Sequence, residues 1–425
     1  MTNVATDNTT PEADVTPGDI EPTGGFTALR QPGFAKYLGT LALSMTGMWV
    51  RITAMGYLVY DLTDDPFKLG VVSFVQSAPQ VLLSPIAGAY IDRMDRRKLL
   101  IGVQLTILTA MIILTYMIAT DTITYGRLLA IAAIIGSMAT FDWPARLSLV
   151  PKLVHRKFLA SAVALNSAVF NAAKVAGPAF GGWLIAAVGM TAAFGYIALV
   201  AVPFVIVLIT MRHLSGGRKK ADGPIAKPWT TLAEGYRYMW RTPDIRAMLS
   251  VDVIPIVLGM SYIGMAPAVA RDVLDLGAGG LGLMLTFNGI GSLAGTLLVA
   301  RVSSTSRRRG MMVLYAILTF SISLIIFGLS SEIWLSFGII TLLGMAYAFS
   351  STMNDTLIQL RVDDEYRGRV MSLYSTFWGF SPAGALLAGF LANHIGVQWA
   401  VAVNGILVLA YMPYLWLATP MRSIE

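Results

Sequence analysis

Residues 88–100 read GAYIDRMDRRKLL, and they place four basic and two acidic side chains within seven positions of an otherwise apolar chain. The flanking stretches are VVSFVQSAPQVLLSPIAGAYI at 71–91 and LLIGVQLTILTAMIILTYMIA at 99–119. A helix rises about 1.5 Å per residue, so about 20 apolar residues cross a hydrocarbon layer of about 30 Å. We therefore expect residues 88–100 to form a charged connection between two membrane-spanning helices.

The composition of the whole chain excludes a water-soluble globule. Hydrophobic residues make up 56% of the 425 positions and charged residues 13%, whereas soluble domains carry about 25% charged residues. Long apolar runs recur throughout, and the short alternating segments of a membrane barrel do not occur. The chain has no cysteine, which excludes disulfides, thiolate catalysis and cysteine metal sites. The fold class is therefore an all-α polytopic membrane protein.

The apolar pattern predicts twelve transmembrane helices in two pseudo-symmetric six-helix bundles. A long polar stretch between them combines a Gly-, Lys- and Arg-rich linker with a short interfacial helix, LAEGYRYMWRTPDIR. The predicted domains are a disordered cytoplasmic tail (1–34), an N-terminal bundle (35–211), a cytoplasmic linker (212–244), a C-terminal bundle (245–418) and a cytoplasmic tail (419–425). The predicted helices span 37–60, 67–91, 97–119, 126–150, 157–187, 190–211, 245–270, 279–301, 310–330, 333–355, 366–393 and 397–418.

Two pairs of stretches repeat 207 positions apart and indicate a duplicated six-helix unit. Gly88 before DRMDRRK corresponds to Gly295 before ARVSSTSRRRG, and GPAFGGWLIAAVG at 177–189 corresponds to GALLAGFLANHIG at 384–396. Parallel repeats of six helices are one plan of secondary transporters, in which the substrate site lies near the midplane between the halves.

The distribution of Lys and Arg predicts the orientation, because these residues accumulate on the cytoplasmic side of a membrane. With both termini in the cytoplasm, all but five of the 31 Lys and Arg residues lie on the cytoplasmic side. The exceptions are Lys68, Arg127 and Arg271 on the other side, and Arg51 and Lys174 inside helices. Topology thus explains the net charge of +7, and no nucleic-acid partner is expected.

The opening stretch resembles the loop between helices 2 and 3 of the major facilitator superfamily, with the pattern G-x-L-A-D-R-x-G-R-[RK]. The matching residues are Gly88, Asp92, Arg93, Arg96 and Arg97. Asp95 stands where most members have Gly, which resembles the branch of siderophore exporters and macrolide efflux proteins. The resemblance covers about 35–418. Further similar stretches are PARLSLVPKLV (144–154), ALNSAVFNAAKVAGPAFGG (164–182), EGYRYMWRTPDIR (234–246) and RGRVMSLYSTFWGFSPAGALLAG (367–389).

The resemblance implies that this loop gates the cytoplasmic side. Asp92 would cap the helix that starts near Arg367, where the positive helix end favours a carboxylate, or would pair with Arg146. The predicted gating residues are Gly88, Asp92, Arg93, Arg96 and Arg146. The alternative for the basic residues is that they only fix the topology.

Four ionisable residues are expected inside helices, where charge is costly and usually faces a cavity or a partner. They are Arg51, Asp142, Lys174 and Asp252. The acids are the candidates for proton coupling, because a carboxylate in a partly dry cavity can exchange a proton. The alternative for Asp142 is an ion pair with Arg146 or Arg51, and the alternative for Asp252 is solvation near the interface.

Other polar and aromatic residues within the predicted helices are candidates for lining a substrate cavity, although aromatic residues in membrane helices more often pack or anchor. Together with Arg51 and Lys174, these candidates are Gln76, Asn166, Asn171, Asn288 and Trp378.

The sequence motifs of common enzyme classes are absent from this chain or lack the structural context that they need. GAGGLG at 277–282 matches a dinucleotide-binding pattern, but no strand precedes it. A P-loop, a zinc-protease motif and a nucleophile elbow are absent, so neither an enzyme nor a cofactor or metal site is expected.

The sequence therefore predicts a secondary active transporter of the cytoplasmic membrane, which exports an amphipathic organic molecule or drug in exchange for protons by alternating access. The alternatives are a dedicated siderophore or metabolite exporter, a lysophospholipid flippase, and a non-transporting membrane sensor. The expected partners are the lipid bilayer, the small-molecule substrate and protons, and the expected state is a monomer.

Overall fold

The computed structural model describes residues 26–211, 228–303, 306 and 308–424. Within helices, it leaves out the side chains of 84–93, 228–232, Asp364, Ser372 and Ser375. The described chain is almost entirely helical, and the helices form twelve rods in two bundles.

Six rods form the N-terminal bundle. They are α1 (Pro32–Thr63), α2 (Pro66–Arg93), α3 (Arg96–Ala119), α4 (Tyr125–Leu153), α5 (Leu159–Val188) and α6 (Met190–Thr210). A short 3₁₀ turn, Thr27–Arg30, precedes α1, so ordered backbone begins before residue 35.

The C-terminal bundle begins with a rod that is broken by proline. Helix α8 (Pro243–Ile254) passes through a π-turn at Pro255–Gly259 into α9 (Ser261–Ala268) and a second π-turn, Val269–Val273. Proline lacks an N–H and disturbs the preceding turn, which explains the first break. The other rods are α10 (Ala278–Val302), α11 (Arg309–Leu329), α12 (Ile333–Arg361), α13 (Asp364–Gly379) followed by α14 (Pro382–Ile395), and α15 (Val397–Leu417).

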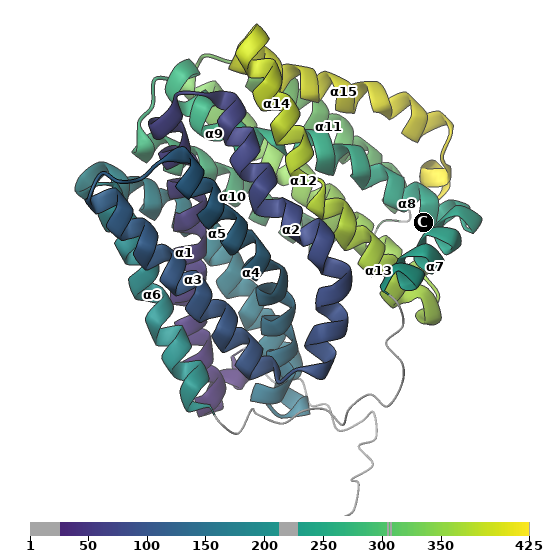
Figure 1. Ribbon diagram of the computed structural model, residues 1–425. Helices are drawn as coiled ribbons and strands as arrows, with labels where there is room; N and C mark the ends of the chain where they lie inside the picture. The colour runs from purple at the N-terminus through teal and green to yellow at the C-terminus, as the bar shows by residue number, and fades with distance from the viewer. Residues whose placement is uncertain (1–25, 212–227, 304–305, 307, 425) are drawn as a thin grey trace, which may run out of the picture.

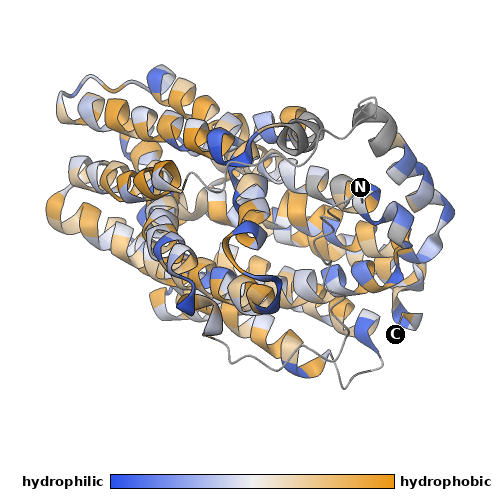
Figure 2. Ribbon diagram, turned by 90° about the horizontal axis from the view of Figure 1, so that it is seen from below, coloured by the Kyte–Doolittle hydropathy of each residue, from blue (hydrophilic) through white to orange (hydrophobic). Residues whose placement is uncertain are grey.

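Nine rods in the described part of the chain are long and apolar enough to cross a membrane. The other three are α1, α2 and the α13–α14 rod, which is interrupted before Pro382. Large apolar side chains point outward, such as Leu199 at 68% and Trp334 at 83% exposure, as expected of lipid-facing surfaces. Figure 2 shows hydrophobic residues along the outer helices.

The amphipathic helix α7 (Pro228–Arg241) lies outside the twelve rods and packs against α13. The Tyr238 ring stacks on the Tyr366 ring with centroids 4.4 Å apart, and Arg369 Nε lies 3.2 Å from Glu234 Oε2. Helix α7 is therefore attached to the C-terminal bundle by aromatic and ionic contacts.

The two bundles meet through matching glycines of the internal repeat. A Cβ on Gly182 of α5 would lie 2.4 Å from the Ala278 carbonyl oxygen of α10, and a Cβ on Gly389 of α14 would lie 2.6 Å from the Pro66 carbonyl oxygen of α2. These two glycines are 207 positions apart. Each bundle thus contributes the same small residue to an equivalent close helix contact.

The molecule has two unlike ends, which we name from their connections. The sealed end holds the connections 64–65 and 274–277, and the basic end holds 94–95, 154–158 and 362–363. Figure 1 shows the bundles meeting near the top of the view, where α2 and α14 lie side by side, and diverging toward the bottom and the right. The bundles are therefore joined at the sealed end.

Helix α12 continues beyond the predicted end at residue 355. Met353, Leu357 and Ile358 are all buried, and this spacing places them on one inward face of a helix. Hydropathy alone ended the helix too early, because polar residues follow Met353 although the buried face continues to Ile358. Asp355 therefore lies within the rod and not at its tip.

Candidate functional site

A cavity of about 360 Å³ lies between the two bundles. Helices α1 and α2 line one side, and α9, α10 and α14 line the other. The polar lining residues are Thr53, Ser73, Gln76, Ser77 and Ser381, and none of the lining residues is charged. We call this space the inter-bundle cavity. It suits the apolar or neutral part of an organic molecule.

A second cavity, of about 170 Å³, lies inside the N-terminal bundle among α1, α3, α4 and α6. Arg146 Nε lies 2.8 Å from Asp142 Oδ2, and Gln104 Nε2 donates to Asp142 Oδ1 at 2.5 Å. Arg146 also donates to Ser44 Oγ at 3.1 Å. Arg51 lines the same cavity. We call this space the N-bundle cavity.

The C-terminal bundle holds a buried carboxylate cluster. Asp252 of α8 is 1% exposed, and its Oδ2 accepts hydrogen bonds from Asn354 Nδ2 at 2.7 Å and from the Tyr374 hydroxyl at 2.8 Å. Tyr374 also interacts with Asp355. Among the described side chains, the buried Oδ1 atom of Asp355 has no hydrogen-bond partner. The cluster therefore joins α8, α12 and α13 through two carboxyl groups.

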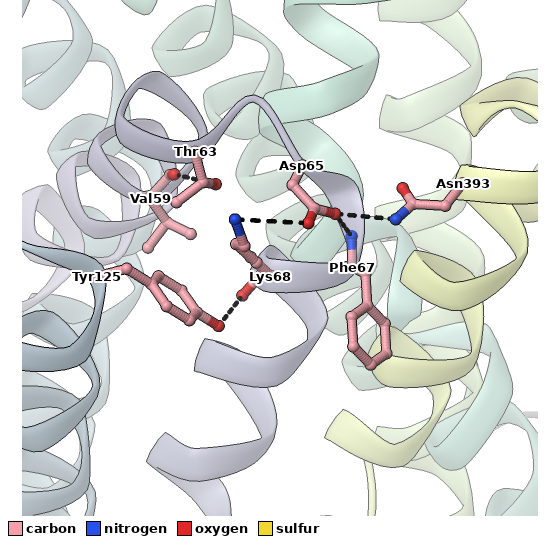
Figure 3. A network of polar contacts seen from close by, with 7 residues as sticks. All are labelled: Val59, Thr63, Asp65, Phe67, Lys68, Tyr125 and Asn393. Atoms are coloured by element: carbon pink, nitrogen blue, oxygen red, sulfur yellow. Dashed lines mark hydrogen bonds and ion pairs between the residues drawn. The ribbon is translucent and has the colours of Figure 1, made fainter.

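The sealed end is held by polar contacts between the bundles. Arg271 Nη2 lies 3.1 Å from Asp64 Oδ1, and the Tyr60 hydroxyl donates to Asp272. Asp65 accepts from Asn393 Nδ2 of α14 at 3.0 Å, as Figure 3 shows. All of these residues lie at the tips of α1, α2, α14 and the α9 rod.

A threonine also joins the bundles where Pro178 interrupts the hydrogen-bond ladder of α5. The Thr286 hydroxyl of α10 donates to the Val175 carbonyl oxygen at 2.9 Å and accepts from the Ala179 N–H at 3.0 Å. Side-chain hydroxyls of this kind satisfy backbone groups near a proline in a membrane helix.

Comparison with known proteins identifies the architecture. Residues 23–425 match the family described as transmembrane secretion effector. The chain belongs to this family. It is a major facilitator transporter. The transporter is similar to a bacterial homologue of the human lysosomal transporter Spinster in an inward-facing, unoccupied conformation, with a TM-score of 0.71, 12% identity, and coverage of 93% of this chain and 98% of that one.

Three curated relatives cover most of the transporter. The staphyloferrin A transporter of Staphylococcus aureus is 24% identical and covers 86% of this chain and 90% of its own. The multidrug efflux pump Tap of Mycolicibacterium fortuitum is 25% identical, with coverage of 83% and 87%. The macrolide efflux protein A of Streptococcus pyogenes is 21% identical, with coverage of 87% and 91%. The transporter is therefore similar to efflux pumps and to a siderophore transporter, as the sequence predicted.

The predicted gate lies partly outside the described side chains. Gly88, Asp92 and Arg93 lie in the last turns of α2, but their side chains are among those left out. Arg96 Nη1 donates to the Ser148 carbonyl oxygen of α4 at 3.2 Å. Arg146 is paired with Asp142 in this conformation, which is the alternative predicted for Asp142.

The other charged residues of the opening stretch stabilise helix ends of the transporter. Asp95 is the N-cap of α3 and accepts from the Arg97 N–H at 3.0 Å and the Lys98 N–H at 3.3 Å. Arg97 is buried and donates to the carbonyl oxygens of Leu208 and Ile209 at 2.6 Å each. Asp95 thus performs a capping role that glycine at this position would perform less well.

The predicted cavity residues fall in different places. Gln76 lines the inter-bundle cavity, and Arg51 lines the N-bundle cavity. Asn288 is buried in the C-terminal bundle and donates to the Tyr262 hydroxyl at 2.7 Å. Trp378 is half-buried, and its ring lies 6.0 Å from that of Tyr347.

The remaining three candidates lie on α5. Lys174 Nζ lies 6.0 Å from the centroid of the Trp49 ring, and Asn171 donates to the Ser167 carbonyl oxygen within the helix at 2.9 Å. Asn166 is half-buried. Of the seven predicted cavity residues, which are all described, Gln76 alone lines the inter-bundle cavity.

Sequence reasoning missed Asp355, Asn354 and Tyr374, which complete the Asp252 cluster. The available signal was the pair Asn354–Asp355, an amide and a carboxyl at the end of a predicted membrane helix. The predicted helix end at residue 355 places this pair at the tip of a span and not within the bundle.

Proposed function

We propose that the transporter exports an amphipathic organic molecule or drug from the cytoplasm in exchange for protons. The inter-bundle cavity is the observation that carries this proposal, because it is uncharged, largely apolar and enclosed by both bundles at the sealed end. A ligand there contacts both halves, so its binding depends on their relative tilt. Alternating access requires this dependence.

The excess of Lys and Arg at the basic end supports a cytoplasmic location for that end. Arg96, Arg156, Lys157, Arg361 and Arg369 lie at or near it. The conformation described here is then joined on the outer side and open to the cytoplasm. The transporter would be a multi-pass protein of the cytoplasmic membrane with both termini inside.

The Asp252 cluster is the proposed site of proton coupling. Negative charge buried within a membrane bundle is costly, and a proton removes that charge. Protonation also alters the hydrogen bonds that Asn354 and Tyr374 donate to Asp252. Because these bonds connect three helices, gain or loss of a proton changes how α8, α12 and α13 pack, which couples protonation to the tilt of the bundle.

The curated relatives support efflux, since two of them are named as efflux pumps for drugs or macrolides. The similarity to a staphyloferrin A transporter supports a second candidate, the dedicated export of a siderophore or another metabolite. The two candidates share the same cavity and the same proton chemistry, and they differ only in the breadth of substrates.

The test is transport in proteoliposomes with an imposed proton gradient. The probes are a fluorescent cationic dye, a macrolide and an iron-free siderophore, and a labelled lysophospholipid tests the flippase alternative. We expect gradient-dependent movement of at least one probe, and a loss of about tenfold or more in Asp252→Asn and Asp355→Asn. Asp244→Asn is the matched control, because Asp244 forms an exposed pair with Arg361 on the same side. Transport that survives collapse of the gradient would contradict proton exchange.

A further inference from the structure

The N-bundle cavity has an excess of positive charge. Its lining includes the guanidinium groups of Arg51 and Arg146 and the single carboxylate of Asp142, and its other lining residues are uncharged. The lining therefore carries a net charge of one positive unit within a membrane bundle. Such a charge is costly unless an anion or water compensates it.

The same cavity has an excess of hydrogen-bond donors. Arg146 is 5% exposed and uses Nε and Nη2 for Asp142 and Ser44, while its buried Nη1 has no hydrogen-bond partner among the described residues. Arg51 forms no ion pair or hydrogen bond with any residue in the described parts of the chain. Both Asp142 oxygens already accept a hydrogen bond. They therefore have little remaining capacity to accept from Arg51 or from Arg146 Nη1.

The size of the cavity restricts what can compensate this charge. A volume of about 170 Å³ is below the range of about 300–1,000 Å³ that drug-sized ligands occupy. It accommodates a halide with a few waters, or the carboxylate end of a longer molecule. Trp143 lines the cavity and is 41% exposed, so that side of the cavity reaches the surface of the bundle.

We propose that the N-bundle cavity binds a compact monovalent anion between Arg51 and Arg146. Guanidinium groups bind halides and carboxylates through charge and parallel N–H donors. The anion has two possible sources with the same chemistry, namely free chloride or a carboxylate of the transported molecule. The second source rests on the proposed export function, and the first is independent of it.

The test is equilibrium binding to the purified full-length protein in detergent, without a membrane or gradient. The probes are radiolabelled chloride and radiolabelled acetate. We expect saturable binding of at least one of them, weakened about tenfold or more in Arg51→Gln and in Arg146→Gln. Arg237→Gln is the control, because Arg237 is exposed on α7, and it should bind as the parent does. Asp142→Asn removes the one negative charge and should tighten binding.

Each outcome decides the proposal. Chloride binding that both arginine variants lose supports the site with a free halide as its ligand. Acetate binding alone, lost in the same variants, supports it with a substrate carboxylate. Absence of saturable binding for both probes, or binding that persists in both arginine variants, overturns the proposal. Failure of the transport assay leaves these binding results unaffected, so the two proposals fail separately.

Discussion

At the scale of single residues, removal of the Asp142–Arg146 pair has the clearest expected effect on the free energy of unfolding. The side chains are 14% and 6% exposed, and they lie within one turn of α4. Removing one partner of a buried pair leaves an uncompensated charge and typically costs about 3–5 kcal/mol. Arg146→Met should therefore lower the free energy of unfolding in mixed micelles by about that amount.

The matched control for this prediction is Arg361→Met. Arg361 Nη1 lies 2.7 Å from Asp244 Oδ2, but the side chains are 40% and 37% exposed. Exposed pairs contribute about 0–1 kcal/mol, so the control should change stability little. Equal losses in the two variants would show that burial of the Asp142 pair has no energetic consequence.

The two acidic sites show what sequence can and cannot reveal about individual residues. Asp142 and Arg146 are four positions apart, and this spacing places them on one helix face, so their pairing was open to prediction. The bonds from Asn354 and Tyr374 to Asp252 cross 102 and 122 positions. Such contacts depend on how three helices pack, which no local pattern contains.

At the scale of elements, hydropathy predicted where helices lie but not how they bend. The lengths of the apolar runs predict twelve rods because bilayer thickness fixes the length of a span. The π-turn after Ile254 and the break before Pro382 are local departures from regular α-helix at prolines. The sequence does not determine the geometry of a proline kink. The close approach of α5 to α10 at Gly182 likewise emerged only from the structure.

The glycine contact gives a test of the sealed end. A Cβ on Gly182 would lie 2.4 Å from the Ala278 carbonyl oxygen and 2.9 Å from the Gly282 Cα atom, so the backbone of α10 must move away. Gly182→Val should therefore open the sealed end. Because the natural chain has no cysteine, Ser73→Cys in the inter-bundle cavity provides a clean reporter.

With the sealed end on the outer side, as proposed above, the measurement is the rate at which a membrane-impermeant maleimide, added outside the cell, labels Ser73→Cys. We expect a several-fold increase with Gly182→Val. Gly195→Val is the control, because its Cβ would meet only the Thr115 methyl at 3.8 Å. A Gly182→Val protein that expresses normally and labels at the parent rate would contradict a sealing role for this contact.

At the scale of the whole molecule, the duplicated plan was visible in sequence, whereas the tilt between the halves was not. The repeat of 207 positions predicts two similar bundles, and both copies of the glycine-rich stretch lie at equivalent contacts. The relative tilt depends instead on a few contacts between distant residues, such as Asp65 with Asn393. In bistable proteins, small changes in contacts of this kind favour one state over the other.

The Asp65 contact makes a prediction about the pH dependence of this tilt. Burial acts to raise the pKa of the Asp65 carboxyl, but hydrogen bonds from Asn393 and the Phe67 N–H, together with the Lys68 charge, outweigh burial and lower the pKa below its ordinary value. A carboxyl with a lowered pKa stabilises the folded contact above its ordinary pKa and loses that contribution only as the pH falls through the lowered value. The Asp65 carboxyl should therefore stay ionised between about pH 5 and pH 8, and the strength of its contact with Asn393 should not change in this range.

Maleimide labelling of Ser73→Cys tests this prediction. The labelling rate of the parent, which carries Ser73→Cys alone, is compared with that of the protein that also carries Asp65→Asn at each pH. The neutral amide oxygen that Asp65→Asn introduces would accept a weaker hydrogen bond from Asn393 of the other bundle than the carboxylate does, so this variant should label faster than the parent. The ratio of the two rates should not change from pH 5 to pH 8, since Asp65 does not titrate there. A ratio that falls toward one as the pH is lowered to 5 would show that Asp65 takes up a proton in this range, and would make the sealed end itself a sensor of acidity on the side that it faces.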